Sequence, residues 1–328
     1  MKDAWNRIID YIRISITDRC NLRCVYCMPK DGVTFLEHDK IITYEEILTI
    51  CREMVKMGIR KVKITGGEPL VRKNTVWLVE ELKKIPGIES VTMTTNGVLL
   101  KDQIRDLAKA GLDAVNVSLD TLKREEFQRV TGFDCLEQVL EGIDEALSCP
   151  GLTVKLNCVP VRSEDSRENI LQLAALAKDK PLHVRFIELM PIGLGQEMDG
   201  YEEESIRTMM EEVYGPMKPF QKTLGNGPCV YYSLEGFQGK IGFISAVSHK
   251  FCDQCNRVRL TSDGVLKACL QYGTGVNLKE LIADGCDTET LRKAIEETIW
   301  KKPQEHQFGV KKEEIENQEQ KKMFCIGG

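Results

Sequence analysis

The sequence predicts an α/β fold: an incomplete (βα)6 barrel of the TIM type, with a smaller C-terminal α+β extension that covers its open side. Between residue 11 and about residue 190, short β-rich runs alternate with amphipathic helical stretches. Strands joined by helix-length connections must be parallel. Cysteine and glycine motifs directly follow the first strands, and ligands gather at these C-terminal strand ends. A doubly wound sheet is the alternative, but strands that end in such residues favour the barrel.

The predicted barrel elements follow one another in regular order. The first helix opens with Thr43 and Glu46, which have the spacing of a capping box, and it closes at Gly58; the third closes at Gly111. The strands are predicted at residues 11–17, 61–65, 90–95, 114–119, 153–159 and 183–189. The helices are predicted at residues 43–57, 74–84, 102–110, 135–148 and 166–178.

After residue 190 the composition changes, and this change divides the chain. Residues 191–228 are rich in glycine, proline and acidic residues, and they indicate a connection that carries one helix near 203–214. We therefore expect two domains, the barrel at 1–228 and a C-terminal domain at 229–328. The second domain is expected to contain strands at 229–234, 240–247, 257–261 and 265–270, a turn at Asp263-Gly264 and a helix at 288–300.

The overall composition narrows the function. The formal net charge of −5 argues against a general nucleic-acid-binding surface, so an anionic ligand would need a local cluster of Lys and Arg. The first residues lack the apolar stretch of a signal peptide, and no apolar run is long enough to span a bilayer. A cytoplasmic protein is therefore expected. In a reducing compartment, 13 cysteines indicate metal binding, catalysis or core packing rather than disulfides.

Three of these cysteines, Cys20, Cys24 and Cys27, follow the first strand with the spacing C-x3-C-x2-C. Three thiolates on one short loop can bind three irons of a four-iron cluster, which leaves the fourth iron open. A structural zinc ion is the alternative, but it needs a fourth ligand close by, and His38 lies eleven residues further on. The triplet therefore favours an open iron–sulfur cluster.

A second group of cysteines has the spacing C-x2-C-x13-C and consists of Cys252, Cys255 and Cys269. His249 precedes this triplet and could complete a Cys3His zinc site, so zinc is a serious alternative here. Arg257 and Arg259 alternate along the strand predicted next, which places both on one face. Two guanidinium groups beside a metal site suit an anionic ligand, because Arg offers planar bidentate donors to phosphate.

Cationic residues also stand at predicted strand positions of the barrel, where Lys and Arg are rare unless they are paired or face a ligand. These residues are Arg13, Lys63, Lys155 and Arg185. One alone would suggest a salt bridge or a side chain that reaches solvent. Four on parallel strands of one arc, in an acidic protein, predict a basic cavity for a ligand such as a nucleoside triphosphate.

These motifs resemble those of a known superfamily. A cysteine triplet after strand one, followed by Gly66-Gly67-Glu68-Pro69 after strand two, is typical of radical S-adenosylmethionine (SAM) enzymes. Within that superfamily, the chain resembles the family of GTP cyclases that begins molybdenum cofactor biosynthesis. This closer resemblance rests on both triplets and on the motifs Thr-Thr-Asn-Gly at 94–97, Val-Ser-Leu-Asp at 117–120 and Asn-Arg-Val-Arg at 256–259.

The resemblance implies a reaction and its cofactors. Two [4Fe–4S] clusters and SAM would serve the enzyme, and a 5′-deoxyadenosyl radical would remove the hydrogen from carbon 3′ of GTP. The resulting carbon radical would attack carbon 8 of the guanine. One electron and one proton would then complete 3′,8-cyclo-7,8-dihydroguanosine 5′-triphosphate.

The resemblance also implies roles for particular residues. The first triplet would bind the cluster that cleaves SAM, and the second triplet would bind a cluster that contacts the guanine. The residues implied at SAM are Tyr26, Gly67, Ser118 and Met190. The residues implied at GTP are Arg13, Lys63, Thr94, Lys155, Arg257, Val258 and Arg259. Lys63 stands where an arginine is expected, and it offers phosphate a point charge without the fork.

The end of the chain is implied in catalysis as well, together with Arg13. The resemblance implies that Gly327 and Gly328 enter the active site, whereas the residues alone favour a frayed chain end. Two glycines are slim enough for a narrow, occupied cavity.

The implied partners are GTP, an electron-donor protein and the cyclic pyranopterin monophosphate synthase of the next step. Neither nucleic acid nor a membrane is expected, and monomer and homodimer both stay open. A peptide-modifying radical SAM enzyme with an auxiliary cluster is one alternative, although a first strand near residue 11 leaves no room for a peptide-docking region. A non-catalytic zinc-bound scaffold or an electron carrier is another.

Overall fold

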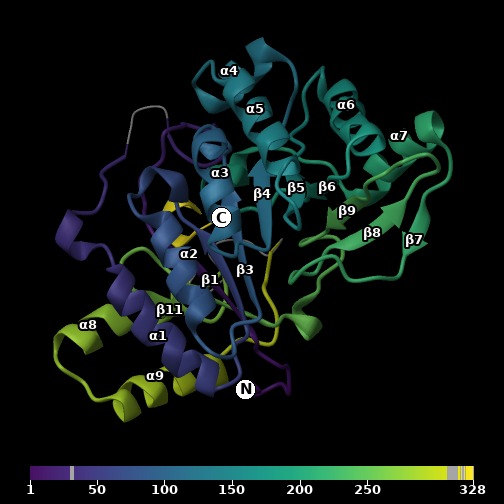
Figure 1. The fold of residues 1–328 in the computed structure, drawn as a ribbon. Coiled ribbons are helices and arrows are strands. Elements are labelled where there is room, and N and C mark those ends of the chain that lie inside the picture. The colour runs from purple at the N-terminus through teal and green to yellow at the C-terminus, as the bar shows by residue number, and fades with distance from the viewer. Residues whose placement is uncertain (30–32, 309–316, 318, 320, 322, 328) are drawn as a thin grey trace.

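Six parallel strands with helices between them form the wall of an open barrel, as predicted (Figure 1). The computed structural model describes residues 1–29, 33–308, 317, 319, 321 and 323–327. The six strands are β1 (Tyr11–Ser15), β2 (Lys61–Thr65), β3 (Ser90–Thr95), β4 (Ala114–Ser118), β5 (Thr153–Cys158) and β6 (His183–Ile187).

The six barrel strands differ from the predicted ones only at their C-terminal ends. β2 and β3 have the predicted bounds, whereas the other four end one or two residues earlier. The residues that follow turn into the loops of the cavity instead of continuing the ladder. Val159, directly after β5, donates its N–H to the Asp120 carboxylate rather than to a neighbouring strand.

Helices cover the outer face of this wall (Figure 1). They are α1 (Tyr44–Lys56), α2 (Thr75–Lys84), α3 (Leu100–Lys109), α4 (Arg124–Thr131), α5 (Leu136–Leu147) and α6 (Ser166–Asp179). The predicted capping box opens α1, because Thr43 and Glu46 each accept the other's backbone N–H through their side chains. α4 is absent from the prediction, since its charged sequence buries only Phe127 and Thr131.

The part of the chain after β6 extends the same sheet at both edges. Its strands are β7 (Lys218–Phe220), β8 (Val230–Ser233), β9 (Ile241–Ile244), β10 (Arg257–Leu260), β11 (Val265–Lys267) and β12 (Val276–Asn277). β9 lies parallel beside β6, and β10 lies parallel beside β1. Among the described residues the sheet order is β12-β11-β10-β1-β2-β3-β4-β5-β6-β9-β8-β7. The predicted extension therefore borders the open side of the barrel from both edges.

Further helices complete the described chain. α7 (Glu203–Tyr214) and α9 (Thr288–Trp300) have the predicted bounds, whereas α8 (Leu278–Ala283), β7 and β12 are absent from the prediction because they are short. The remaining helices are α10 (Met323–Ile326) and the 3-10 helices η1 (His38–Lys40), η2 (Pro69–Val71), η3 (Gly193–Glu197) and η4 (Cys252–Gln254). None of the helices within the described residues combines the length and the apolar character that a bilayer crossing requires.

The residues of each barrel strand alternate between two environments, and this alternation creates a polar interior. In β1, Ile12 and Ile14 are fully buried in the core under the helices, whereas Arg13 points into the barrel. Lys63 in β2 is in register with Arg13 and faces the same way. Parallel strands with both faces covered are usually apolar throughout. Cations on the inner face therefore indicate a cavity for a polar ligand.

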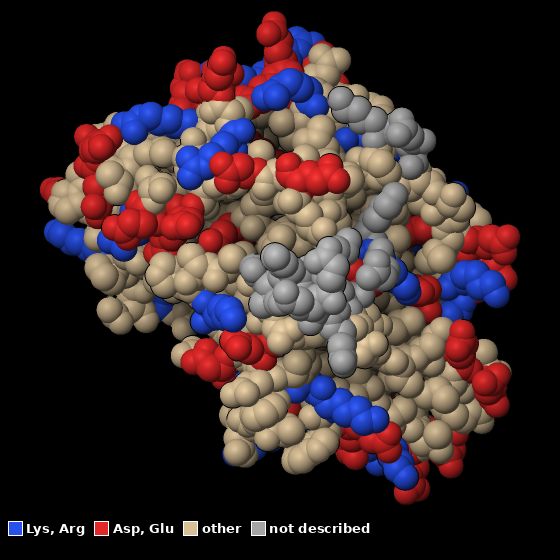
Figure 2. All heavy atoms as spheres, turned by 180° about the vertical axis from the view of Figure 1, so that it is seen from behind, with Lys and Arg blue, Asp and Glu red and all other residues tan. Residues whose placement is uncertain are grey.

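The outer surface has a different charge pattern. On the face that Figure 2 shows, acidic and basic side chains are interspersed, in keeping with the formal net charge of −5. The concentration of positive charge that the sequence predicts lies instead inside the barrel, on the strands described above.

Candidate active site

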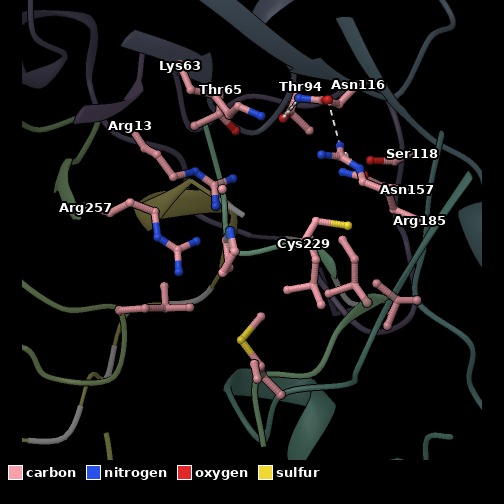
Figure 3. Close-up of a pocket in the computed structure, with 18 of the residues that line it drawn as sticks. Arg13, Lys63, Thr65, Thr94, Asn116, Ser118, Asn157, Arg185, Cys229 and Arg257 are labelled. Atoms are coloured by element: carbon pink, nitrogen blue, oxygen red, sulfur yellow. Dashed lines mark hydrogen bonds between the residues drawn. The ribbon is translucent and has the colours of Figure 1, made fainter. Parts of the chain in front are cut away.

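A cavity of about 620 Å³ occupies the barrel interior, within the range of cavities that hold small molecules. Inward-facing residues of the six barrel strands and of β9 and β10 form its wall. Figure 3 shows Arg13, Arg185 and Arg257 directed into this space from three different strands. Both cysteine triplets line it as well. Motifs that lie far apart in the sequence therefore line one cavity.

The first triplet lies in the loop after β1. Cys27 and Met28 donate their N–H groups to the Cys24 carbonyl and close a tight turn, and the Cys20 thiol accepts from the Asn96 amide at 3.7 Å. Burial raises the pKa of all three thiols, that of Cys27 to about 12. Cysteine binds metal as the thiolate, and a metal cation compensates the charge that burial disfavours. The donor set therefore fits a cluster.

Gly66 and Gly67 let the loop after β2 approach the first triplet. A Cβ at Gly66 would lie 2.7 Å from the Thr17 carbonyl oxygen, and a Cβ at Gly67 would lie 2.5 Å from the Arg19 carbonyl oxygen. Any larger residue would push the two loops apart. The close packing of these two loops therefore requires glycine at both positions.

Glu68 joins the loops after β2 and β3. Its carboxylate accepts from the N–H groups of Leu70 and Asn96 and from the Thr95 hydroxyl. Burial raises the pKa of this carboxyl to about 7, although the hydrogen bonds oppose the shift. Because the Asn96 side chain also donates to the Cys20 thiol, Glu68 fixes the loop that contacts the first triplet.

The residues predicted at SAM line the same cavity as the first triplet. Tyr26 donates its hydroxyl to the Asp120 carboxylate at 2.7 Å, so its ring is held in place. The cavity-lining residues of this group are Tyr26, Gly67, Ser118 and Met190. They come from the last residue of β4 and from the loops after β1, β2 and β6. These are the C-terminal strand ends at which such folds bind ligands.

The second triplet lies on the C-terminal extension. Its members line the cavity and are Cys252, Cys255 and Cys269. His249, the fourth ligand of the zinc alternative, is exposed, does not line the cavity and contacts the Ser248 hydroxyl at 3.2 Å. His249 is therefore not placed to complete the predicted Cys3His site, and three cysteines that face a ligand cavity favour a second open cluster.

Positive charge acts on the second triplet. Burial raises the pKa of Cys255, but Lys302 and Arg257 outweigh burial and lower it to about 6. Its thiolate is therefore available near neutral pH, as metal binding requires.

The register of the sheet brings the predicted cations together. Arg13 on β1 stands beside Lys63 on β2 and beside Arg259 on β10. Burial, followed by the charges of Arg185 and Arg13, lowers the pKa of Lys63 well below its usual value. Burial and Arg185 likewise lower the pKa of Lys155 to about 8. Because these positive charges repel one another, an anion in the cavity would be favoured.

Two asparagines hold Arg185 in place, and neither was predicted as a site residue from the sequence. Its guanidinium donates to the side-chain oxygens of Asn116, at 2.7 Å, and Asn157 (Figure 3). Asn157 lies two residues after Lys155, so strand alternation places both on the inner face. Lys155 donates to the Leu224 carbonyl at 2.6 Å, and no local pattern indicates that the loop around Leu224 lines the cavity.

The remaining predicted residues fall into three positions. Those that line the cavity with the cations are Thr94, Arg257 and Arg259. Val258 is fully buried and in register with Ile12 on the outer face, so its side chain does not reach the cavity. Gly327 lies inside the barrel, where its carbonyl accepts from Arg259 and an added Cβ would lie 2.7 Å from Thr65 Cγ2. Gly328 lies outside the described residues.

Comparisons with known proteins agree with this architecture. Residues 14–197 match the family model of the Radical SAM superfamily, and residues 182–308 match that of Molybdenum Cofactor Synthesis C. The crystal structure of Streptococcus suis SuiB bound to S-adenosylmethionine has a TM-score of 0.61 at 16% identity, over 88% of this chain and 68% of that chain. At that identity the likeness shows the fold alone. The fold and the first family model together define a radical SAM protein.

Curated relatives narrow this class. GTP 3′,8-cyclase of Clostridium perfringens is 43% identical over 328 residues, which are 100% of both chains. GTP 3′,8-cyclase of Listeria monocytogenes is 40% identical over 334 residues, which cover 100% of this chain and 99% of the relative. The chain belongs to the GTP 3′,8-cyclase family. Its cofactors are two [4Fe–4S] clusters and SAM, as the sequence predicts.

Proposed function

We propose that this protein converts GTP into 3′,8-cyclo-7,8-dihydroguanosine 5′-triphosphate, the first step of molybdenum cofactor biosynthesis. One observation carries the proposal: two cysteine triplets and a group of cations line a single cavity inside a radical SAM barrel. A nucleoside triphosphate carries negative charge at one end and a purine ring at the other. The cations suit the negatively charged end, and the second metal site beside them suits the purine ring.

The first triplet is proposed to hold the cluster that serves SAM. When bound, this cluster and SAM supply a 5′-deoxyadenosyl radical, which removes hydrogen from carbon. The protein orients SAM through Tyr26, which Asp120 fixes, and through Gly67, Ser118 and Met190. Gly67 lets the loop after β2 lie close to the backbone of Arg19, next to the first triplet.

The cations are proposed to hold the triphosphate of GTP while the second triplet holds the cluster at the guanine. The residues in contact with GTP would be Arg13, Lys63, Thr94, Lys155, Arg257 and Arg259, with Val258 acting through its backbone. Burial and repulsion between the cations lower the pKa of Lys63 and Lys155, and phosphate charges would oppose both effects. Fixing both ends of the substrate places the ribose hydrogen for abstraction, and positioning of this kind supplies much of a catalyst's effect.

The C-terminal glycines are proposed to take part in catalysis together with Arg13. Gly327 has a φ of 73°, in the left-handed region that favours glycine, and its carbonyl accepts from Arg259. The tail is thereby linked to one of the cations assigned to GTP. We extend this role to Gly328 from the sequence.

The relatives support GTP as the substrate. An electron-donor protein and cyclic pyranopterin monophosphate synthase belong to the proposal as partners. The cytoplasmic location and the division into domains 1–228 and 229–328 belong to it as well. Monomer and homodimer are equally compatible with it.

Anaerobic incubation with GTP, SAM and a reductant tests the proposal. The product is an isomer of GTP, so the nucleotides must be separated by chromatography before mass analysis. The expected result is a new nucleotide with the mass of GTP, formed together with 5′-deoxyadenosine and only when SAM is present. Cleavage of SAM without a new nucleotide would argue against GTP as the substrate.

A further inference from the structure

Lys302 lies beside the second triplet although no sequence motif marks it. It follows α9, is only 3% exposed and lines the cavity. Its ammonium donates to the carbonyl oxygens of Arg257 and Ala268. Arg257 begins β10, two residues after Cys255, and Ala268 directly precedes Cys269. One side chain thus joins the two separate segments that carry these cysteines.

The ammonium of Lys302 lies beside the triplet, because both of its acceptors belong to residues within two positions of a cysteine. Within the described chain, its hydrogen-bond partners are the two neutral carbonyl groups. Burying an ammonium is costly unless negative charge lies near it. Cysteine thiolates and an iron–sulfur cluster would supply that charge.

The position of Lys302 is fixed from the other side by the N-terminal segment. Trp5 donates its indole N–H to the Lys302 carbonyl at 2.9 Å. Arg7, which is 7% exposed and paired with Asp3, donates to the Cys252 carbonyl at 2.7 Å. Arg7 also donates to the carbonyls of residues 303 and 304, directly after Lys302. The segment after α9 and the loop of Cys252 are therefore held in one arrangement.

We propose that Lys302 is a positioning residue of the second cluster, which joins the segments of Cys255 and Cys269 and stabilises the reduced cluster with its buried charge. The inference rests on the proposed function, which assigns that cluster to Cys252, Cys255 and Cys269. Reduction adds one negative charge to a cluster, and a cation held nearby in a poorly solvated site favours the reduced form. Removal of the charge should therefore lower the reduction potential of this cluster.

Redox titration of the full-length chain, followed by electron paramagnetic resonance, tests the inference. The parent protein carries alanine at Cys20, Cys24 and Cys27, so that only the second cluster is observed. Lys302→Met should shift the reduced-to-oxidised ratio at a fixed potential by about tenfold toward the oxidised form, or about 59 mV for one electron. Lys302→Arg retains the charge and should keep the parent value. Lys301→Met alters the exposed neighbour and is the matched control.

Iron analysis of the same variants separates the outcomes. A Lys302→Met protein with about four irons and the potential of the Lys301→Met control would overturn the inference. Selective loss of iron from Lys302→Met, with Lys302→Arg and Lys301→Met still loaded, would support the positioning role. A parent protein that binds no second cluster would overturn the assignment in the proposed function, and the inference with it.

Discussion

The two cysteine triplets line the same cavity, yet the chain holds them in different ways. The first lies within one loop, and burial there raises the pKa of each thiol, that of Cys27 to about 12. The second spans a hairpin: burial raises the pKa of Cys252, whereas Lys302 and Arg257 outweigh burial at Cys255 and lower its pKa to about 6. A cluster at the second triplet would therefore lie in more positive surroundings, which favour its reduced state. The difference suits one centre that gives an electron to SAM and another that binds substrate.

Replacing one cysteine in each triplet should have the largest effect on activity, and it tests whether the two triplets have different roles. Cys20→Ala should abolish SAM cleavage, because the first cluster loses one of its three protein ligands. Cys269→Ala should keep part of that cleavage but lose cyclisation of GTP, because it alters only the substrate end. Both effects are measured in one anaerobic reaction, as 5′-deoxyadenosine and as cyclised nucleotide.

The matched control for these two variants is Cys286→Ala, since Cys286 is a half-buried cysteine outside both triplets. It should leave both products unchanged. Cyclisation that survives Cys269→Ala would contradict the role of the second triplet.

Metal content should distinguish the triplets with the next largest effect. Anaerobic reconstitution should yield about eight irons per chain, and Cys252→Ala should yield about four. Metal and sulfide analysis of the purified proteins measures this directly. About four irons together with one zinc in the unaltered protein would restore the zinc alternative for the second triplet.

Arg257→Ala should weaken GTP binding and spare the abortive cleavage of SAM. Losing one hydrogen-bonding partner of a charged group costs about 1.5–3 kcal/mol, which corresponds to about 10- to 150-fold in the dissociation constant. Anaerobic titration calorimetry measures GTP binding, and 5′-deoxyadenosine formed without GTP measures the cleavage. Arg129→Ala, on the exposed face of α4, is the control. An unchanged dissociation constant for Arg257→Ala would count against the basic cavity.

Lys63→Arg should have the smallest effect on GTP binding, and it tests how the charge of Lys63 contributes to that binding. Burial and then Arg185, Arg13, Lys155 and Arg257 lower the pKa of Lys63, so its charged form is disfavoured relative to that of an ordinary lysine. Phosphate stabilises the charged form and raises that pKa again, so GTP binding should take up protons. Affinity should accordingly increase as the pH falls through about 8, the value to which the pKa of Lys155 is lowered.

Arginine stays protonated, so Lys63→Arg should reduce this proton uptake by up to about one proton per GTP. Lys155, with a pKa lowered to about 8, should still contribute some uptake. Calorimetry in two buffers of different ionisation enthalpy measures the protons directly. Equal uptake by both proteins would contradict the role assigned to Lys63.

Much of the fold and part of the site could be predicted from local patterns. Alternating β-rich runs and helices predict the barrel, and the close spacing of Cys20, Cys24 and Cys27 predicts a cluster. Because strand residues alternate, Arg13 and Lys63 could be placed on one inner face. Helix α4 could not be predicted, since few of its residues are apolar.

Lys302 and Arg7 show why the rest of the site could not be predicted. Each is a single cation within a charged or mixed segment, where a solvated side chain is the usual outcome. Their burial depends on tertiary contacts: Arg7 reaches the Cys252 carbonyl across 245 residues of sequence. The Leu224 carbonyl beside Lys155 is a backbone group, which no side-chain pattern reports.

The most direct test of the central claim is the fate of the hydrogen at carbon 3′ of GTP. With GTP that carries deuterium at this carbon, the unaltered protein should form 5′-deoxyadenosine that contains the deuterium, together with a cyclised nucleotide that has lost it. Cys269→Ala should still form some 5′-deoxyadenosine, but without the label. Unlabelled 5′-deoxyadenosine from the unaltered protein would contradict a cavity in which the first triplet acts on GTP held by the second.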